Sequence, residues 1–265
     1  MVSFDDIKAI VSDFDGTILR DGMTSPSPYF YQLTEKALDR NIAFIAASGR
    51  QYANLRHLMA PFSDRIGYIC ENGCFVVYQQ KVVYKSVFPR QLATQILSDI
   101  PKEQRQRVLV SGESRGYLLT GNPDFANHMR NVVGNDFEQV DSFRHIKEDI
   151  LKIAMYFSGE IPAETINSFE KQYGSMVKVV DAGNRWLDFN MRGSGKGEAL
   201  AVLADYMNIP LNRMIAFGDG ENDISMLKTV GIGYAVSDAK PRVKSVVSHV
   251  CENVEEVLEK IIMEK

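Results

Sequence analysis

The sequence predicts an α/β domain built on a parallel sheet, with a second, α+β domain inserted into it. Short apolar runs without polar interruption occur near both ends of the chain, as in residues 42–47. Such runs are typical of parallel strands covered on both faces. Segments with helical spacing of apolar residues separate them. The middle of the chain instead shows short strands and a hairpin signal, which is typical of an α+β domain.

Composition and charge fit a globular protein with one or two domains. The 265 residues are 45% hydrophobic and 24% charged, with a formal net charge of −4, and about 100–200 residues make a domain. This charge argues against broad binding to nucleic acid or to anionic membranes. Three cysteines, an acidic N-terminal segment and apolar runs far below the ~20 residues of a membrane span predict a cytoplasmic protein without a signal peptide.

The first part of the chain alternates predicted strands and helices. Residues 7–12 form an apolar run that ends in acids. Ser27 and Pro28 predict a helix start, with serine as the N-cap and proline at the first helical position. Residues 42–47 and 66–70 are predicted buried strands, each followed by a polar segment that contains glycine.

The last part of the chain repeats this alternation, and the middle part differs. In the last part the sequence predicts strands at 214–217 and 232–236 and helices at 197–207, 224–230 and 255–262. In the middle it predicts a hairpin of 75–78 and 81–84, helices at 92–100 and 161–173, and strands at 108–110, 151–157 and 176–180. We therefore expect a core of residues 1–81 and 187–265 and an inserted domain of residues 82–186.

The strongest candidate for a catalytic segment runs from Asp13 to Thr17. It follows a predicted buried strand, so it lies at the edge where open α/β sheets bind ligands. Asp13 and Asp15 are two residues apart and can face one site, and Gly16 allows a sharp turn. Two carboxylates this close favour a bound cation or a shared proton. An acidic turn without function is the alternative explanation of this segment alone.

A second acidic segment, residues 218–223, follows another predicted strand and precedes a helix. Asp219 falls at the strand end, and Asn222 and Asp223 fall at the helix start. Oxygen ligands of this kind suit Mg²⁺. A polar turn with an N-cap would also explain the pattern.

Two further segments could bind phosphate. Ser48 and Gly49 precede Arg50 at a predicted helix start, where a hydroxyl can donate to a phosphoryl oxygen, although an N-cap serine is the simpler explanation of Ser48. Lys196 lies among glycines, which predicts an exposed lysine that can approach an anion. The segment is not a Walker loop, because Asn190 stands where that motif requires its first glycine.

Taken together, these motifs resemble, in the same order, those of the haloacid dehalogenase superfamily of phosphohydrolases. The residues that carry the resemblance are Asp13, Asp15, Ser48, Gly49, Arg50, Lys196 and 218–223. The long insertion resembles the type IIB cap of the Cof-like branch. The resemblance implies a Rossmann-like core with an α+β cap that sets specificity, and a magnesium-dependent phosphatase.

The resemblance also implies residue roles. Asp13 would attack phosphorus to form an aspartyl-phosphate, and Asp15 would act as general acid and base. The implied catalytic residues are Asp13, Asp15, Ser48 and Lys196. The implied magnesium-binding residues are Asp13, Asp15 through its backbone carbonyl, Asp219, Asn222 and Asp223. The implied substrate-binding residues are Ser48, Gly49, Arg50, Lys196 and Asn222.

The resemblance implies small phosphorylated metabolites as substrates, such as sugar phosphates or phosphorylated cofactors. Two alternatives stay open. A phosphotransferase or phosphomutase on the same scaffold would accumulate a phosphorylated product in place of free phosphate. A protein that only binds phosphorylated metabolites would show no turnover, although the intact carboxylates argue against it.

Overall fold

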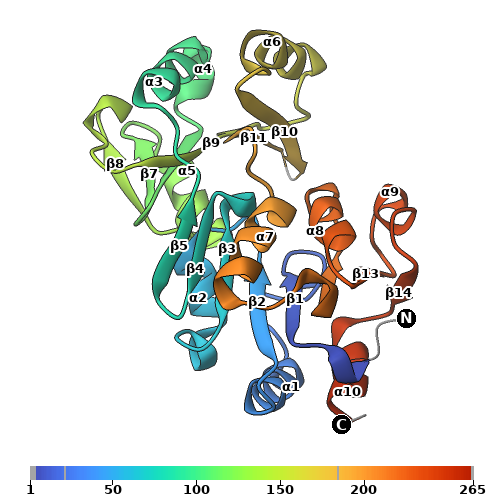
Figure 1. Cartoon of the computed structure of the whole chain (residues 1–265). Helices are drawn as coiled ribbons and strands as arrows, with labels where there is room; N and C mark the ends of the chain where they lie inside the picture. The colour runs from blue at the N-terminus through green and yellow to red at the C-terminus, as the bar shows by residue number, and fades with distance from the viewer. Residues whose placement is uncertain (1–3, 21, 184, 264–265) are drawn as a thin grey trace. The chain divides into compact units, whose positions relative to one another are not determined.

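The structure is a computed structural model that describes residues 4–20, 22–183 and 185–263 (Figure 1). The chain divides into two compact units, Met1–Tyr84 with Gly195–Lys265 and Lys85–Ser194. The sequence predicts the second boundary earlier, after residue 186. The boundary lies later because strand β11 (Trp186–Met191) pairs with β9 (Ile150–Tyr156) and β10 (Val177–Gly183) of the second unit.

The first unit contains an eight-stranded sheet whose order is β14-β13-β12-β1-β2-β3-β4-β5. The strands from β14 to β3 are parallel, and β4 returns antiparallel to β3. Their bounds are β1 Ala9–Asp13, β2 Ala43–Ala47, β3 Gly67–Cys70, β4 Phe75–Tyr78, β5 Lys81–Lys85, β12 Met214–Gly218, β13 Ile232–Val236 and β14 His249–Cys251. Every residue of β1 is buried, which confirms the predicted central strand.

Local sequence signals explain two features of this unit. The Ser27 hydroxyl accepts a hydrogen bond from the Phe30 backbone N–H at 2.9 Å, so Ser27 is the predicted N-cap of α1 (Pro28–Asp39). Gln79 and Gln80 both adopt left-handed backbone angles, with φ of 47° and 65°, which suits the tight turn between β4 and β5.

The helices of the first unit begin with α1. The others are α2 Tyr52–Leu58, α7 Lys196–Met207, α8 Ile224–Thr229, α9 Pro241–Lys244 and α10 Val254–Met263. Single 3₁₀ turns, Glu71–Gly73 and Glu221–Asp223, follow β3 and β12. None of the helices in the described ranges combines the length and the apolar character needed to cross a membrane.

The second unit contains a six-stranded sheet in the order β10-β11-β9-β6-β7-β8, antiparallel except for the β7–β8 pair. The strands not yet given are β6 Val108–Gly112, β7 Gly116–Leu119 and β8 Phe137–Val140, and the helices are α3 Arg90–Asp99, α4 Lys102–Arg105, α5 Pro123–His128 and α6 Ala163–Tyr173. Successive residues of β9 belong to different apolar clusters: Ile153 belongs to the cluster that includes Phe169 of α6, and Ala154 belongs to the cluster that includes Phe125 of α5. Both faces of this sheet are therefore covered in part.

Candidate active site

Three neighbouring strands carry the predicted catalytic segments to one edge of the eight-stranded sheet. Asp13 is the last residue of β1, and β1 lies between β12 and β2. Asp219 directly follows β12, and Ser48 directly follows β2. Because these strands are parallel, their carboxyl ends lie at the same edge. Segments that are far apart in the sequence thus meet at the predicted place.

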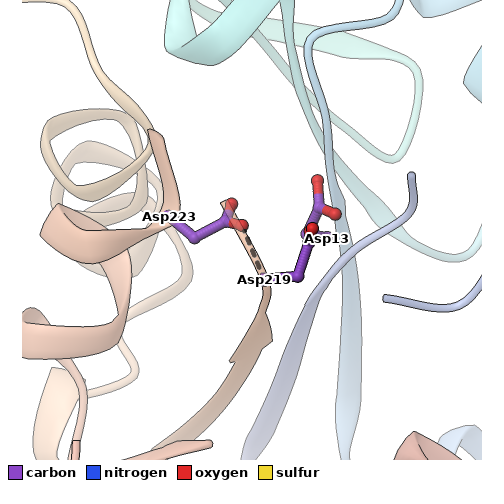
Figure 2. A group of neighbouring side chains, drawn as sticks. All are labelled: Asp13, Asp219 and Asp223. Atoms are coloured by element: carbon purple, nitrogen blue, oxygen red, sulfur yellow. Dashed lines mark hydrogen bonds between the residues drawn. The ribbon is translucent and has the colours of Figure 1, made fainter. Parts of the chain in front are cut away.

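Asp13, Asp219 and Asp223 form a cluster of carboxylates (Figure 2). One oxygen from each of them lies within 4.8 Å of the others. Asp13 and Asp223 are buried, at 4% and 0% exposed. The backbone N–H groups of Asp219 and Gly220 donate to Asp223 Oδ2 at 3.1 and 2.9 Å, which fixes the loop after β12.

Lys196 is completely buried in this cluster, so the expectation of an exposed lysine was wrong. Its Nζ donates to Asp13 Oδ1 and to Asp223 Oδ1, both at 2.6 Å. The glycines around it allow close packing rather than exposure. A Cβ at Gly73 would lie 2.3 Å from the Gly195 carbonyl oxygen, and a Cβ at Gly197 would lie 2.7 Å from the Ser225 carbonyl carbon.

Burial and mutual repulsion control the charge of the cluster. Burial raises the pKa of Asp13 well above its usual value, and the nearby Asp223 raises it further, while Lys196 opposes both effects. Burial and Asp223 likewise raise the pKa of Asp219. Burial lowers the pKa of Lys196, but the adjacent Asp13 and Asp223 outweigh burial and raise it, so the lysine stays charged.

The residues of the cluster fit a divalent cation. Three carboxylates against one ammonium group leave two negative charges unbalanced when all are ionised. Asp13 Oδ2 is buried and accepts no hydrogen bond from any described residue. Oxygen donors with excess negative charge are what Mg²⁺ requires. Asn222, which the sequence predicts as a further ligand, lies outside this carboxylate cluster. Its side chain is exposed, and its Nδ2 donates to Asn72 Oδ1 at 3.0 Å.

Asp15 lies beside this cluster in sequence but makes different contacts. Its side chain is 50% exposed, and the Arg50 guanidinium binds both of its oxygens, with Nε donating to Oδ2 at 2.8 Å and Nη2 donating to Oδ1 at 2.5 Å. Ser48 Oγ donates to Asp15 Oδ2 at 3.3 Å. Ser48 is therefore not a helix N-cap, since α2 starts at Tyr52 and Gln51 takes the N-cap position.

Two residues that support the site were not predicted from the sequence. Thr17 Oγ1 donates to Asp219 Oδ1 at 3.2 Å, so it links the loops after β1 and β12. Asn72 adopts a left-handed conformation with φ of 58°, and a Cβ at Gly49 would lie 3.0 Å from its Oδ1. Thr17 belongs to the first acidic motif, so its place in that motif was an available signal. Only the fold brings Asn72 to Asn222.

Gly16 is required at its position for two reasons. Its φ of +87° lies in the left-handed region, where a side chain is strained. A Cβ there would also lie 2.5 Å from Asp219 Oδ2. The glycine therefore allows the loop after β1 to approach the Asp219 carboxylate, which follows the neighbouring strand β12.

Comparison with known proteins finds the same architecture. Residues 10–261 match a family described as haloacid dehalogenase-like hydrolase. The chain is 26% identical over 233 residues to the 5-amino-6-(5-phospho-D-ribitylamino)uracil phosphatase YbjI of Escherichia coli strain K12, covering 88% of this chain and 86% of that protein. TM0651 of Thermotoga maritima aligns with a TM-score of 0.84 at 24% identity over 96% of this chain and 97% of that one. The subclass IIB sugar phosphatase BT4131 aligns with a TM-score of 0.81 at 21% identity over 96% and 98%, and both structures show the shared fold alone.

Proposed function

Because the chain belongs to the haloacid dehalogenase-like hydrolase family, as its motifs predicted, we propose that it is a magnesium-dependent phosphatase. It would hydrolyse small phosphorylated metabolites through an aspartyl-phosphate on Asp13. The observation that carries the proposal is the environment of Asp13, a buried carboxylate at the end of a central strand. Lys196 holds one of its oxygens, and no described residue donates to the other.

Asp13 is the proposed nucleophile. Covalent catalysis divides hydrolysis into formation and breakdown of a phosphoryl-enzyme. The hydrogen bond from Lys196 to Oδ1 fixes the orientation of the Asp13 carboxylate within the site. Lys196 also supplies positive charge where the transferring phosphoryl group develops negative charge.

The metal site is proposed to consist of Asp13, Asp219 and the backbone carbonyl of Asp15. When bound, Mg²⁺ supplies positive charge that offsets the charge of the phosphoryl oxygens. Asp223 holds Lys196 and the loop after β12 through its three hydrogen bonds. Asn222, exposed and held by Asn72, is proposed to contact the phosphate.

Asp15 is the proposed general acid and base. It would donate a proton to the leaving alcohol and then take one from the attacking water. Arg50 orients this carboxylate through a two-point contact. Ser48, with the backbone at Gly49, is proposed to bind a phosphoryl oxygen. Arg50 follows Gly49 directly in the sequence and is proposed to contact the bound substrate as well.

The proposed substrates are small phosphorylated metabolites, and the inserted unit is proposed to select among them. A relative supports this class, because it is named for a phosphoribitylamino uracil compound. A cap of this kind contributes specificity and excludes bulk water during the reaction.

A phosphate-release assay tests the proposal. The purified protein is given a panel of sugar, polyol, nucleotide and cofactor phosphates with and without Mg²⁺. We expect release that requires the metal and that falls at least about 10⁴-fold in Asp13→Asn, because loss of a nucleophile removes the covalent route. Accumulation of a transferred phosphoryl group in place of free phosphate would favour a phosphotransferase. Binding without any release would contradict the proposed activity.

A further inference from the structure

The turn that follows β3 in the first unit has an uncommon backbone conformation. Glu71, Asn72 and Gly73 have φ of 51°, 58° and 99°, so three successive residues are left-handed. Only glycine adopts this region freely, and strained backbone of this kind is found most often at functional sites. The contacts of this turn show what its conformation achieves.

Backbone hydrogen bonds hold the turn against the loop that contains Ser48. The Asn72 N–H donates to the Ser48 carbonyl oxygen at 3.1 Å, and the Glu71 N–H donates to the Arg50 carbonyl oxygen at 3.0 Å. A Cβ at Gly49, between these two residues, would lie 3.0 Å from Asn72 Oδ1. The Asn72 side chain therefore lies directly against the backbone of Gly49.

The same side chain also reaches the loop after β12. Asn222 Nδ2 donates to Asn72 Oδ1 at 3.0 Å, although 150 positions separate the two residues in sequence. An amide nitrogen carries two hydrogens, so Asn222 Nδ2 can make this bond with one and donate the other to a ligand. Asn72 thus contacts two segments that are proposed to bind phosphate, Gly49 and Asn222.

Gly73 brings the turn close to a third such segment. A Cβ at Gly73 would lie 2.3 Å from the carbonyl oxygen of Gly195, the residue directly before Lys196. All of these residues belong to the first unit. The turn therefore packs against each of the segments of this unit that carry proposed phosphate donors.

We propose that Asn72 is a positioning residue, which holds the Asn222 amide at a fixed place relative to the Ser48 loop so that both donate to one phosphate group. The inference rests on the proposed phosphatase function. An exposed side chain loses rotamer freedom when it binds a ligand, and this loss weakens binding. The hydrogen bond to Asn72 restricts the Asn222 amide before the ligand arrives. The left-handed turn is needed because it places the Asn72 side chain against both loops.

Replacement of Asn72 by glycine tests this role. Glycine adopts φ of 58° without strain, so Asn72→Gly removes the amide and keeps the turn. We expect kcat/KM for p-nitrophenyl phosphate to fall about 10–100-fold, because a displaced donor meets the phosphoryl group poorly. Asn208→Gly is the matched control, since Asn208 is an exposed, left-handed asparagine at the end of α7 with φ of 54°, and it should keep the wild-type kcat/KM.

A double-mutant cycle separates positioning from a general loosening of the fold. If Asn72 acts by holding Asn222, then Asn72→Gly should cause no further loss of kcat/KM in the Asn222→Ala background, because the amide that it holds is absent. Losses that multiply in the double variant, or a wild-type kcat/KM in Asn72→Gly, would overturn the proposal.

Calorimetric titration with inorganic phosphate and Mg²⁺ separates this inference from the phosphatase activity. If wild type released no phosphate from any ester, the proposed activity would fail, but the titration would still test Asn72. We expect the Kd for phosphate to rise about 3–10-fold in Asn72→Gly, as for the loss of one hydrogen bond, and to stay unchanged in Asn208→Gly. An equal Kd in wild type and Asn72→Gly, or no binding of phosphate by wild type, would contradict the positioning role.

Discussion

Replacement of Lys196 by methionine should destabilise the first unit and abolish most activity. Lys196 is 0% exposed and its Nζ contacts two carboxylates at 2.6 Å. Removing one partner of a buried ion pair leaves uncompensated charge and costs about 3–5 kcal/mol. Each kcal/mol lowers the Tm of a domain of this size by about 2–4 °C, so we expect a decrease of about 6–20 °C at neutral pH.

The pH dependence of this variant follows from the carboxylates that remain. Burial raises the pKa of Asp13, so the folded state binds a proton more readily than the unfolded state. A raised carboxyl pKa makes the folded state relatively more stable as pH falls toward the unfolded value. Lys196→Met should therefore recover part of its lost Tm at mildly acidic pH, and Mg²⁺ should recover part of it at neutral pH.

Differential scanning calorimetry over a pH series measures these effects. Lys228→Met is the control, because Lys228 is an exposed lysine of α8 in the same unit. Activity of Lys196→Met should fall by about 10²–10³-fold or more, as for loss of a buried transition-state donor. A variant with wild-type Tm at every pH would refute the assignment of Lys196 as the buried cation of the cluster.

Three further changes test other contacts of the site. Gly16→Ala should lower the free energy of unfolding by about 1–3 kcal/mol and weaken activation by Mg²⁺, because the new Cβ would displace Asp219. The control is Gly22→Ala. Gly22 is also left-handed, at φ +79°, but a Cβ there would have no neighbour within 4 Å, so a Mg²⁺ titration should show unchanged activation. Arg50→Lys should lower kcat about 10-fold, because a lysine cannot make the two-point contact with Asp15; an unchanged kcat would show that this contact is dispensable. Burial raises the pKa of Asp219, so the metal-free protein loses stability as pH rises through that pKa. The Tm increase caused by Mg²⁺ should therefore grow with rising pH, and Mg²⁺ at 100 times Kd should add ~2.7 kcal/mol to the free energy of unfolding. A Tm increase that is constant with pH would contradict ionised carboxylate ligands.

Sequence patterns predicted the parts of the fold whose signals are local. The apolar run before Asp13 became the central strand β1, and Ser27 with Pro28 marked the start of α1. Strands β7, β8, β11 and β14 were not predicted. Strands β7, β8 and β14 have only three or four residues, and β11 lies between β9 and β10 in the sheet, a pairing that no local pattern shows. The late boundary of the inserted unit has the same cause, since β11 takes its place through β9.

In the candidate site, too, the sequence predicted what local patterns determine and not the contacts between distant segments. Strand ends and glycines indicated where the acidic segments would meet. The burial of Lys196 depends on Asp13, 183 positions away in sequence, and on Asp223. Glycines around a lysine are compatible with exposure and with close packing, so the local pattern favoured the wrong interpretation. The contact between Arg50 and Asp15 also joins two separate loops, and neither segment alone predicts it.

Acid-quenched mass spectrometry of the Asp15→Asn variant tests the central proposal most directly. The variant is mixed with p-nitrophenyl phosphate and Mg²⁺, quenched in acid within seconds and digested. Loss of the base should slow breakdown of the intermediate, while a good leaving group still allows its formation. We predict that the peptide containing Asp13 gains the mass of one phosphoryl group and that Asp13→Asn in the same background abolishes the gain. Turnover with no phosphorylated peptide, or the same modification in the Asp13→Asn background, would contradict Asp13 as the nucleophile.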